Sequence, residues 1–142
     1  MEKGKKIWMD GRLVPWDEAN VHVLTHTLHY GLGVFEGIRC YSTVDNKSAI
    51  FRLADHIDRL FASAHIALLK IPFSQSELTE AVIETMKESG LKDGYIRPLV
   101  YLGAGSMGIY PKSNPVKVAV AVWGWGAYLG EDGIKNGIRV KV

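Results

Sequence analysis

Two residues, Tyr95 and Arg97, have the types and spacing to bind an anion. They are two apart in a predicted strand over 95–102, so their side chains leave the same face of the sheet. A tyrosine hydroxyl beside an arginine guanidinium could bind one carboxylate. The same pair could equally form a polar, solvated sheet face, which antiparallel sheets often have. The spacing leaves both interpretations open.

Arg59 is a second candidate for an anion site. It lies on a predicted helix, off the apolar stripe that would face the core. Most arginines in such a position are solvated. A guanidinium is also a planar fork of donors that matches the oxygens of a phosphate group. The pattern alone favours the solvated arginine and does not decide the matter.

Two further motifs need a helix that the sequence does not favour. Gly103 to Gly108 has the G-x-G-x-x-G spacing of a dinucleotide-binding turn, but Pro111 and Pro115 disfavour the helix that must follow. His22, His26 and His29 could share a metal ion on a helix, but the next residues, 30–33, are glycine-rich. We therefore expect a close-approach loop and polar loop histidines, with no metal site.

Aromatic residues gather near the carboxyl end of the chain. Trp123, Trp125 and Tyr128 are interleaved with two glycines. A core edge, an interface or an apolar pocket would each explain such a concentration.

The elements that position these residues follow from periodicity and turn signals. Asp10-Gly11 predicts a tight hairpin turn within 6–14, and the polar run 45–47 predicts a second hairpin between strands at 34–41 and 49–51. An apolar stripe predicts a helix over 53–68, and a capping box at Ser74 predicts another, ending at Ser89-Gly90. Strands follow at 95–102 and 116–123, and Pro98 is expected at an edge or a bulge.

The glycine-rich stretch 124–137 resembles a linker. We therefore predict a small domain over 1–123, a linker over 124–137, and at 138–142 the first strand of a truncated larger domain, running from Ile138 to Val142. A last strand that folds back onto the first sheet is the alternative, because single-sequence topology predictions often fail.

Composition limits the possible classes of function. The 142 residues are 47% hydrophobic and 23% charged with a net charge of +2, which indicates one core and gives little support to nucleic-acid binding. Cys40 is the only cysteine, so an intramolecular disulfide is excluded and a reducing compartment, the cytoplasm, is expected. No apolar run is long enough for a signal peptide or a membrane span.

Several segments together resemble the branched-chain amino acid aminotransferases, a branch of the class IV pyridoxal-phosphate-dependent aminotransferases. The most specific is His29-Tyr30-Gly31-Leu32-Gly33-Val34-Phe35-Glu36-Gly37-Ile38-Arg39-Cys40-Tyr41. It is followed in order by Phe51-Arg52-Leu53, His56, Arg59-Leu60, Tyr95-Ile96-Arg97-Pro98, the loop Gly103 to Gly108, and Trp125-Gly126-Ala127-Tyr128. The resemblance spans nearly the whole chain.

The resemblance implies an α+β small domain, an antiparallel sheet flanked by helices, packed against a larger domain with pyridoxal 5'-phosphate between them. It implies that Arg59 binds the cofactor phosphate, Tyr95 the α-carboxylate and Arg97 the distal carboxylate of glutamate. The substrate side chain would meet Tyr30, Phe35, Gly37, Trp125 and Tyr128, and Tyr30 with the Met107 to Ile109 loop would reach the neighbouring subunit of a homo-oligomer.

The resemblance also implies amino-group exchange between valine, leucine or isoleucine and 2-oxoglutarate. The family's cofactor-binding lysine is expected beyond the linker and beyond Val142, and no lysine here stands in that motif, so the chain alone is expected to be inactive. Alternatives are a non-catalytic oligomerisation or binding module, or a relative of the D-amino acid aminotransferases or aminodeoxychorismate lyases.

Overall fold

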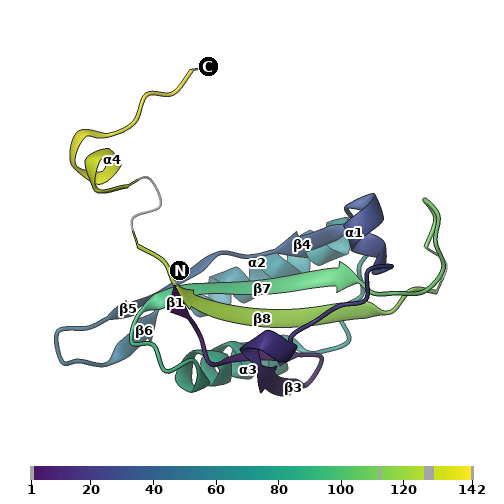
Figure 1. Ribbon diagram of the computed structural model, residues 1–142, viewed down its shortest axis with the longest axis horizontal. Coiled ribbons are helices and arrows are strands. Elements are labelled where there is room, and N and C mark those ends of the chain that lie inside the picture. The colour runs from purple at the N-terminus through teal and green to yellow at the C-terminus, as the bar shows by residue number, and fades with distance from the viewer. Residues whose placement is uncertain (1, 112, 127–129, 142) are drawn as a thin grey trace.

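The computed structural model describes residues 2–111, 113–126 and 130–141. Within them, eight strands form one antiparallel sheet with the order β3-β2-β8-β7-β5-β6, in which β1 also pairs with β8 and β4 with β7 (Figure 1). The strands are β1 Glu2–Lys3, β2 Lys6–Met9, β3 Arg12–Pro15, β4 Gly33–Phe35, β5 Ile38–Ser42, β6 Ser48–Ile50, β7 Gly94–Leu102 and β8 Val116–Gly124. The helices are η1 Trp16–Glu18, α1 His26–Tyr30, α2 Leu53–Ile66, α3 Gln75–Glu88 and α4 Gly130–Asn136. The predicted α+β class is confirmed.

The core lies between one face of this sheet and the helices α2 and α3. Alternate residues of the central strands, such as Ile96 on β7 and Val120 on β8, are fully buried there. Leu60 on α2 and Leu78 on α3 are buried in the same cluster. The strand residues between the buried ones point to the opposite face of the sheet, which carries the candidate site.

Both predicted hairpin turns are present. Asp10 and Gly11 join β2 to β3 with φ values of 47° and 99°, the left-handed backbone that this dipeptide readily adopts. Asn46 has a φ of 63° between β5 and β6. The expected strand 34–41 is split into β4 and β5, with a break at Glu36 and Gly37.

The prediction for Pro98 was wrong in placing it at an edge or a bulge. Pro98 lies in the interior of β7, directly opposite Val120, and the register on both sides of the strand is regular. The Glu36 N–H donates to the Pro98 carbonyl at 3.0 Å, but proline has no N–H to return the second bond of that pair. The missing bond falls at the break between β4 and β5, which is why a central strand tolerates this proline.

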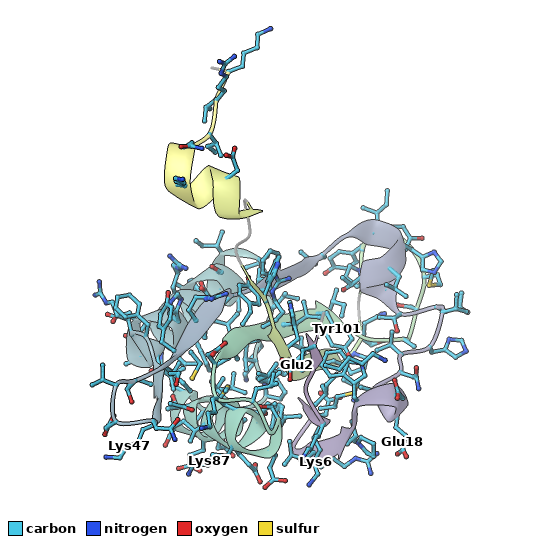
Figure 2. All side chains as sticks on the ribbon, turned by 60° about the vertical axis from the view of Figure 1, so that its left-hand side comes forward. Glu2, Lys6, Glu18, Lys47, Lys87 and Tyr101 are labelled. Atoms are coloured by element: carbon cyan, nitrogen blue, oxygen red, sulfur yellow. The ribbon has the colours of Figure 1, made fainter. Side chains whose placement is uncertain are left out.

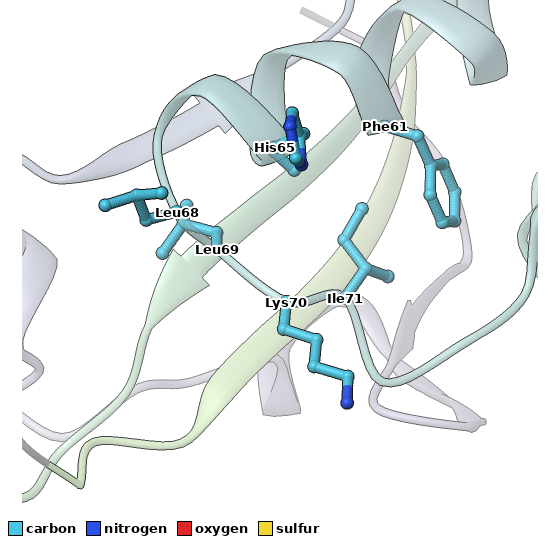
Figure 3. A pocket seen from close by; sticks show the side chains of 7 residues that line it. Phe61, His65, Leu68, Leu69, Lys70 and Ile71 are labelled. Carbon is cyan, nitrogen blue, oxygen red and sulfur yellow. The ribbon is translucent and has the colours of Figure 1, made fainter.

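Of two predicted helix ends, the start of α3 is confirmed and the end of α2 is corrected. At α3 the capping box is complete: the Ser74 N–H donates to the Glu77 carboxylate at 2.7 Å, and the Glu77 N–H donates to the Ser74 hydroxyl at 3.2 Å. The predicted helix over 53–68 ends early, at Ile66, because the chain turns at Leu68, which has a φ of 57° and is 90% exposed. Leu69, and not Leu68, is buried. Both residues line a hollow of about 360 Å³, and Figure 3 shows their side chains at this turn.

The end of the chain differs from the sequence expectation. The stretch expected to be a loop contains the helix α4 over Gly130–Asn136. The strand predicted over 138–142 is not found: residues 138–141 form none, Ile138 and Val140 are exposed, and Val142 lies outside the described residues. A strand needs a neighbour for its backbone groups, and Figure 1 shows α4 and the residues after it apart from the sheet.

Several surface lysines are paired with carboxylates. Lys6 contacts Glu88 at 2.8 Å and Lys47 contacts Asp45 at 2.9 Å. Figure 2 shows Lys6, Lys47 and Lys87 at the outer surface of the sheet and helix layer. Of the helices in the described ranges, none has the length and apolar character needed to cross a membrane.

Candidate functional site

A pocket of about 430 Å³ opens on the sheet face away from α2 and α3, and it contains the predicted anion pair. It is lined by Phe35, Arg39, Tyr95, Arg97 and Trp125. These residues come from β4, β5, β7 and the segment after β8, and strand alternation directs those on the strands to the same face. The Tyr95 and Arg97 pair is therefore neither dispersed nor simply solvated.

Aromatic rings hold the guanidinium of Arg97. It lies 4.2 Å from the ring centre of Phe35 and 5.1 Å from that of Tyr95, and its Nη2 donates to the Tyr95 hydroxyl at 2.9 Å. Its Nε is buried and has no hydrogen-bond partner among the described residues. An unpaired buried donor is costly, which makes the Arg97 guanidinium a candidate for binding an acceptor from a ligand.

The other aromatic rings pack around Tyr95. Its ring centre lies 4.6 Å from that of Trp125 and 5.0 Å from that of Trp123. Arg39 donates from Nη1 to the Trp125 carbonyl at 2.8 Å, which fixes the start of the segment after β8 against the pocket. Of the alternatives left open by the sequence, the pocket wall describes Trp125 best; Tyr128 lies outside the described residues.

The sequence alone did not single out Arg39 as a site residue, although strand alternation could have found it. Arg39 is two residues after Gly37 and four after Phe35, so it shares their face. Trp123, one of the aromatic residues singled out near the carboxyl end, lies directly opposite Tyr95 in the ladder.

Gly37 leaves room for the Tyr95 hydroxyl. A Cβ atom at position 37 would overlap that oxygen. The hydroxyl position that Arg97 requires thus depends on the absence of a side chain at 37.

We expect Gly37→Ala to displace the Tyr95 ring and to weaken carboxylate binding about tenfold, a loss of the order of one charge-assisted hydrogen bond. Titration of the protein with 2-oxoglutarate would measure it. Gly126→Ala is a matched control, because a Cβ atom there meets nothing within 4 Å. Equal affinities in Gly37→Ala and the unmodified protein would contradict this account of the pocket.

Arg59 lies on the opposite face and is held by an acid that the sequence analysis did not single out. Its Nε and Nη2 donate to the two oxygens of Glu36 at 2.6 and 2.7 Å. The Glu36 side chain is 5% exposed, whereas that of Arg59 is 66% exposed. His56 contacts the same carboxylate at 2.9 Å through Nδ1. Arg59 is therefore neither a freely solvated arginine nor a residue of the Arg97 pocket.

Three successive residues connect the two faces. Phe35 packs against Arg97, Glu36 binds Arg59, and Gly37 makes room for Tyr95. Every one of these contacts depends on the backbone at the break between β4 and β5.

The hydrogen bonds from Arg59 hold the pKa of the Glu36 carboxyl below its ordinary value, and burial opposes this only in part. A lowered folded-state pKa stabilises the fold at pH values above the unfolded pKa, and the stabilisation is lost as the pH falls through the folded value. We expect the free energy of unfolding, measured with urea between pH 6 and 3, to fall with acidification below about pH 4.5. In Glu36→Gln the free energy of unfolding should fall less steeply with acidification. The same dependence on pH in both proteins would contradict this prediction.

The remaining predicted substrate residues lie near the other end of β7. Tyr30, on α1, stacks on the buried His26 with ring centres 4.4 Å apart. The Nε2 atom of His26 contacts the Gly108 carbonyl at 2.8 Å, so α1 and the loop that carries Met107 and Ile109 are joined. Tyr30, Met107 and Ile109 are exposed and do not line the Arg97 pocket.

The histidine and glycine motifs do not form the sites that their spacing suggests. A short helix, α1, does form around His26 and His29, and His26 is buried, not a polar loop residue. In the part of the chain that the structure describes, no three His, Cys, Asp or Glu residues are placed to hold a metal ion. The loop after Gly103 approaches closely, since the His26 N–H donates to the Gly103 carbonyl, and no helix follows within its described residues.

Comparisons with known proteins show the family of this chain. Residues 33–141 match the family model for amino-transferase class IV. The branched-chain-amino-acid aminotransferase of Pseudomonas aeruginosa is 51% identical over 95% of this chain and 44% of its own length. That of Escherichia coli K12 is 40% identical over 99% of this chain and 46% of its own length.

Solved structures show the same fold. The crystal structure of the E. coli branched-chain amino acid aminotransferase has a TM-score of 0.88 at 41% identity, over 92% of this chain and 43% of that one. The T.th. branched-chain amino acid aminotransferase with pyridoxamine 5'-phosphate has a TM-score of 0.84 at 48% identity, over 93% and 43%. The chain belongs to the class IV aminotransferase family. It spans less than half the length of the branched-chain aminotransferases that it matches.

Proposed function

We propose that this chain forms the substrate-binding part of an aminotransferase that exchanges amino groups between branched-chain L-amino acids and 2-oxoglutarate. The observation that carries the proposal is the guanidinium of Arg97, held among aromatic rings with a buried Nε that has no partner among the described residues. Such a pocket suits both kinds of substrate. Its rings can desolvate a leucine side chain, and its guanidinium can bind the distal carboxylate of glutamate.

Each residue then has a specific task. Tyr95 orients the α-carboxylate through its hydroxyl, and Arg97 holds that hydroxyl and the distal carboxylate. Phe35 and Trp125 exclude water from the substrate side chain, and Gly37 keeps the hydroxyl in place.

The cofactor in this proposal is pyridoxal 5'-phosphate, because the relatives are aminotransferases and one is a complex with the related pyridoxamine 5'-phosphate. When bound, its ring withdraws electrons from the α-carbon of the substrate. Arg59 is suited to the phosphate: Glu36 binds its Nε and Nη2, and the side chain, which is 66% exposed, lines a hollow of about 380 Å³. None of the five residues that line the pocket is a lysine, so we expect the amine that binds the cofactor covalently to come from outside this pocket.

Tyr30, Met107 and Ile109 would contact the active site of a neighbouring subunit in a homo-oligomer. Their exposure, and the hydrogen bond from His26 that joins α1 to the loop, support this assignment. We also propose a cytoplasmic location, because the single thiol, Cys40, is free and buried.

Steady-state kinetics of the complete encoded protein test the proposal. With 2-oxoglutarate as acceptor, we expect kcat/KM for L-leucine to exceed that for D-alanine by at least about a hundredfold. The reason is that a site that fixes the positions of the carboxylate and the side chain should discriminate between the two enantiomeric series. These 142 residues assayed alone should give none. A preference for D-alanine would favour the D-amino acid branch, and no transamination of any amino acid would overturn the proposal.

A further inference from the structure

Glu36 is a buried acid in the segment that links both faces of the candidate site. Its side chain is only 5% exposed, whereas the preceding residue, Phe35, is exposed. The following residue, Gly37, adjoins the Tyr95 hydroxyl. Burying a carboxylate is costly unless it is paired and hydrogen-bonded. Arg59 and His56 supply three hydrogen bonds, with distances between 2.6 and 2.9 Å.

The geometry of this contact fixes the direction of Arg59. A guanidinium bound by two parallel hydrogen bonds lies in the plane of the carboxylate and cannot rotate freely. Glu36 itself is fixed by the backbone, because its N–H donates to the Pro98 carbonyl at 3.0 Å. A mostly exposed arginine, which would otherwise sample many rotamers, is thus held by the sheet.

The free edge of Arg59 is the one that matters for binding. Its Nε and one N–H of Nη2 face Glu36, which leaves the edge of the planar guanidinium that carries Nη1 for another partner. Arg59 also lines a hollow with Phe51, Arg52, Asp55 and His56. The edge away from Glu36 has the same fork geometry and can bind two oxygens of a phosphate.

We propose that Glu36 is a positioning residue: it orients Arg59 so that the outer edge of the guanidinium is preorganised for the phosphate of the cofactor. This inference rests on the proposed function, in which Arg59 binds that phosphate. Preorganisation raises affinity because less side-chain entropy is lost on binding. Glu36 touches Arg59 and not the ligand, so its effect must act through Arg59.

The ratio of two affinities measures this effect. The probes are pyridoxal 5'-phosphate and pyridoxal, which differ only in the phosphate, and their dissociation constants are measured on the complete protein by cofactor absorbance. We expect Glu36→Gln to reduce the preference for the phosphorylated probe about tenfold, the size of one charge-assisted hydrogen bond. Arg59→Gln should reduce it at least as much, and Glu36→Gln should have no further effect in the Arg59→Gln background.

Controls separate this role from a structural one. A general disturbance of the fold would weaken the binding of both probes and leave the ratio of their dissociation constants unchanged. Glu88→Gln removes an exposed partner of Lys6 and should leave the ratio unchanged. If Glu36→Gln does not fold, Glu36→Asp, which withdraws the charge by one methylene group, should give a smaller loss in the same direction.

The outcomes distinguish the inference from the proposed function. An unchanged ratio in Glu36→Gln, with a reduced ratio in Arg59→Gln, overturns the positioning role and leaves the phosphate contact intact. Unchanged ratios in both variants overturn the phosphate contact and the inference together. Transamination of L-leucine by the unmodified protein is tested separately.

Discussion

Replacing Arg97 by methionine is expected to lower kcat/KM for 2-oxoglutarate about a hundredfold, while kcat/KM for L-leucine changes only a few-fold, because losing a buried charged partner costs about 2–5 kcal/mol. The difference arises because only the 2-oxo acid has a distal carboxylate. L-leucine should be affected only through the Tyr95 hydroxyl, which loses the donor at 2.9 Å. Half-reaction kinetics with each substrate in turn measure both values.

Arg12→Met is the control for this experiment, since Arg12 is an exposed residue of β3 outside the pocket. It should leave both substrates unchanged. Equal losses for L-leucine and 2-oxoglutarate in Arg97→Met would contradict a role in recognising the distal carboxylate.

Truncation of the α2 core is expected to have the largest effect on stability. Leu60 is fully buried between α2 and the sheet. We expect Leu60→Ala to lower the free energy of unfolding by about 3 kcal/mol, from lost burial and the cavity left behind. Urea denaturation followed by circular dichroism measures this difference.

The matched control lies on the same helix. Ile66 is 82% exposed, so Ile66→Ala should change the free energy of unfolding by less than about 0.5 kcal/mol. If the two variants lost equal stability, the core would not lie where α2 places it.

The features predicted correctly from the sequence are those set by local chemistry. The turn at Asp10 and Gly11 needs only residues that accept positive φ, and the capping box at Ser74 and Glu77 closes within one helical turn. Both signals are complete in a few adjacent residues. The predicted α+β class follows from the same local elements.

The wrong predictions all depended on distant partners. Pro98 removes one ladder bond, at the position opposite Glu36 between β4 and β5, and the residues around Pro98 do not reveal that partner. Leu68 matches the helical stripe, but the chain must turn there to bury Leu69. No single-sequence pattern contains this information.

For the candidate site too, the local relation was predicted from the sequence and the long-range contact was not. Tyr95 and Arg97 were predicted to share a face because strand alternation is a local rule, and they do share one pocket. The contact of Glu36 with Arg59 joins residues 23 apart in the chain, and nothing in either position indicates the other. The roles of Arg59 and Arg97 in binding stay predictions, as does a cofactor-binding lysine beyond Val142.

The central claim is that Arg97 binds the distal carboxylate of glutamate. A crystal structure of the complete protein with N-(5'-phosphopyridoxyl)-L-glutamate, the ligand named in one related structure, tests it most directly. We predict that a guanidinium nitrogen of Arg97 lies within about 3.2 Å of a side-chain carboxylate oxygen, a normal hydrogen-bond distance. A carboxylate directed to solvent or to another arginine, with no bond to the Arg97 guanidinium, would contradict it.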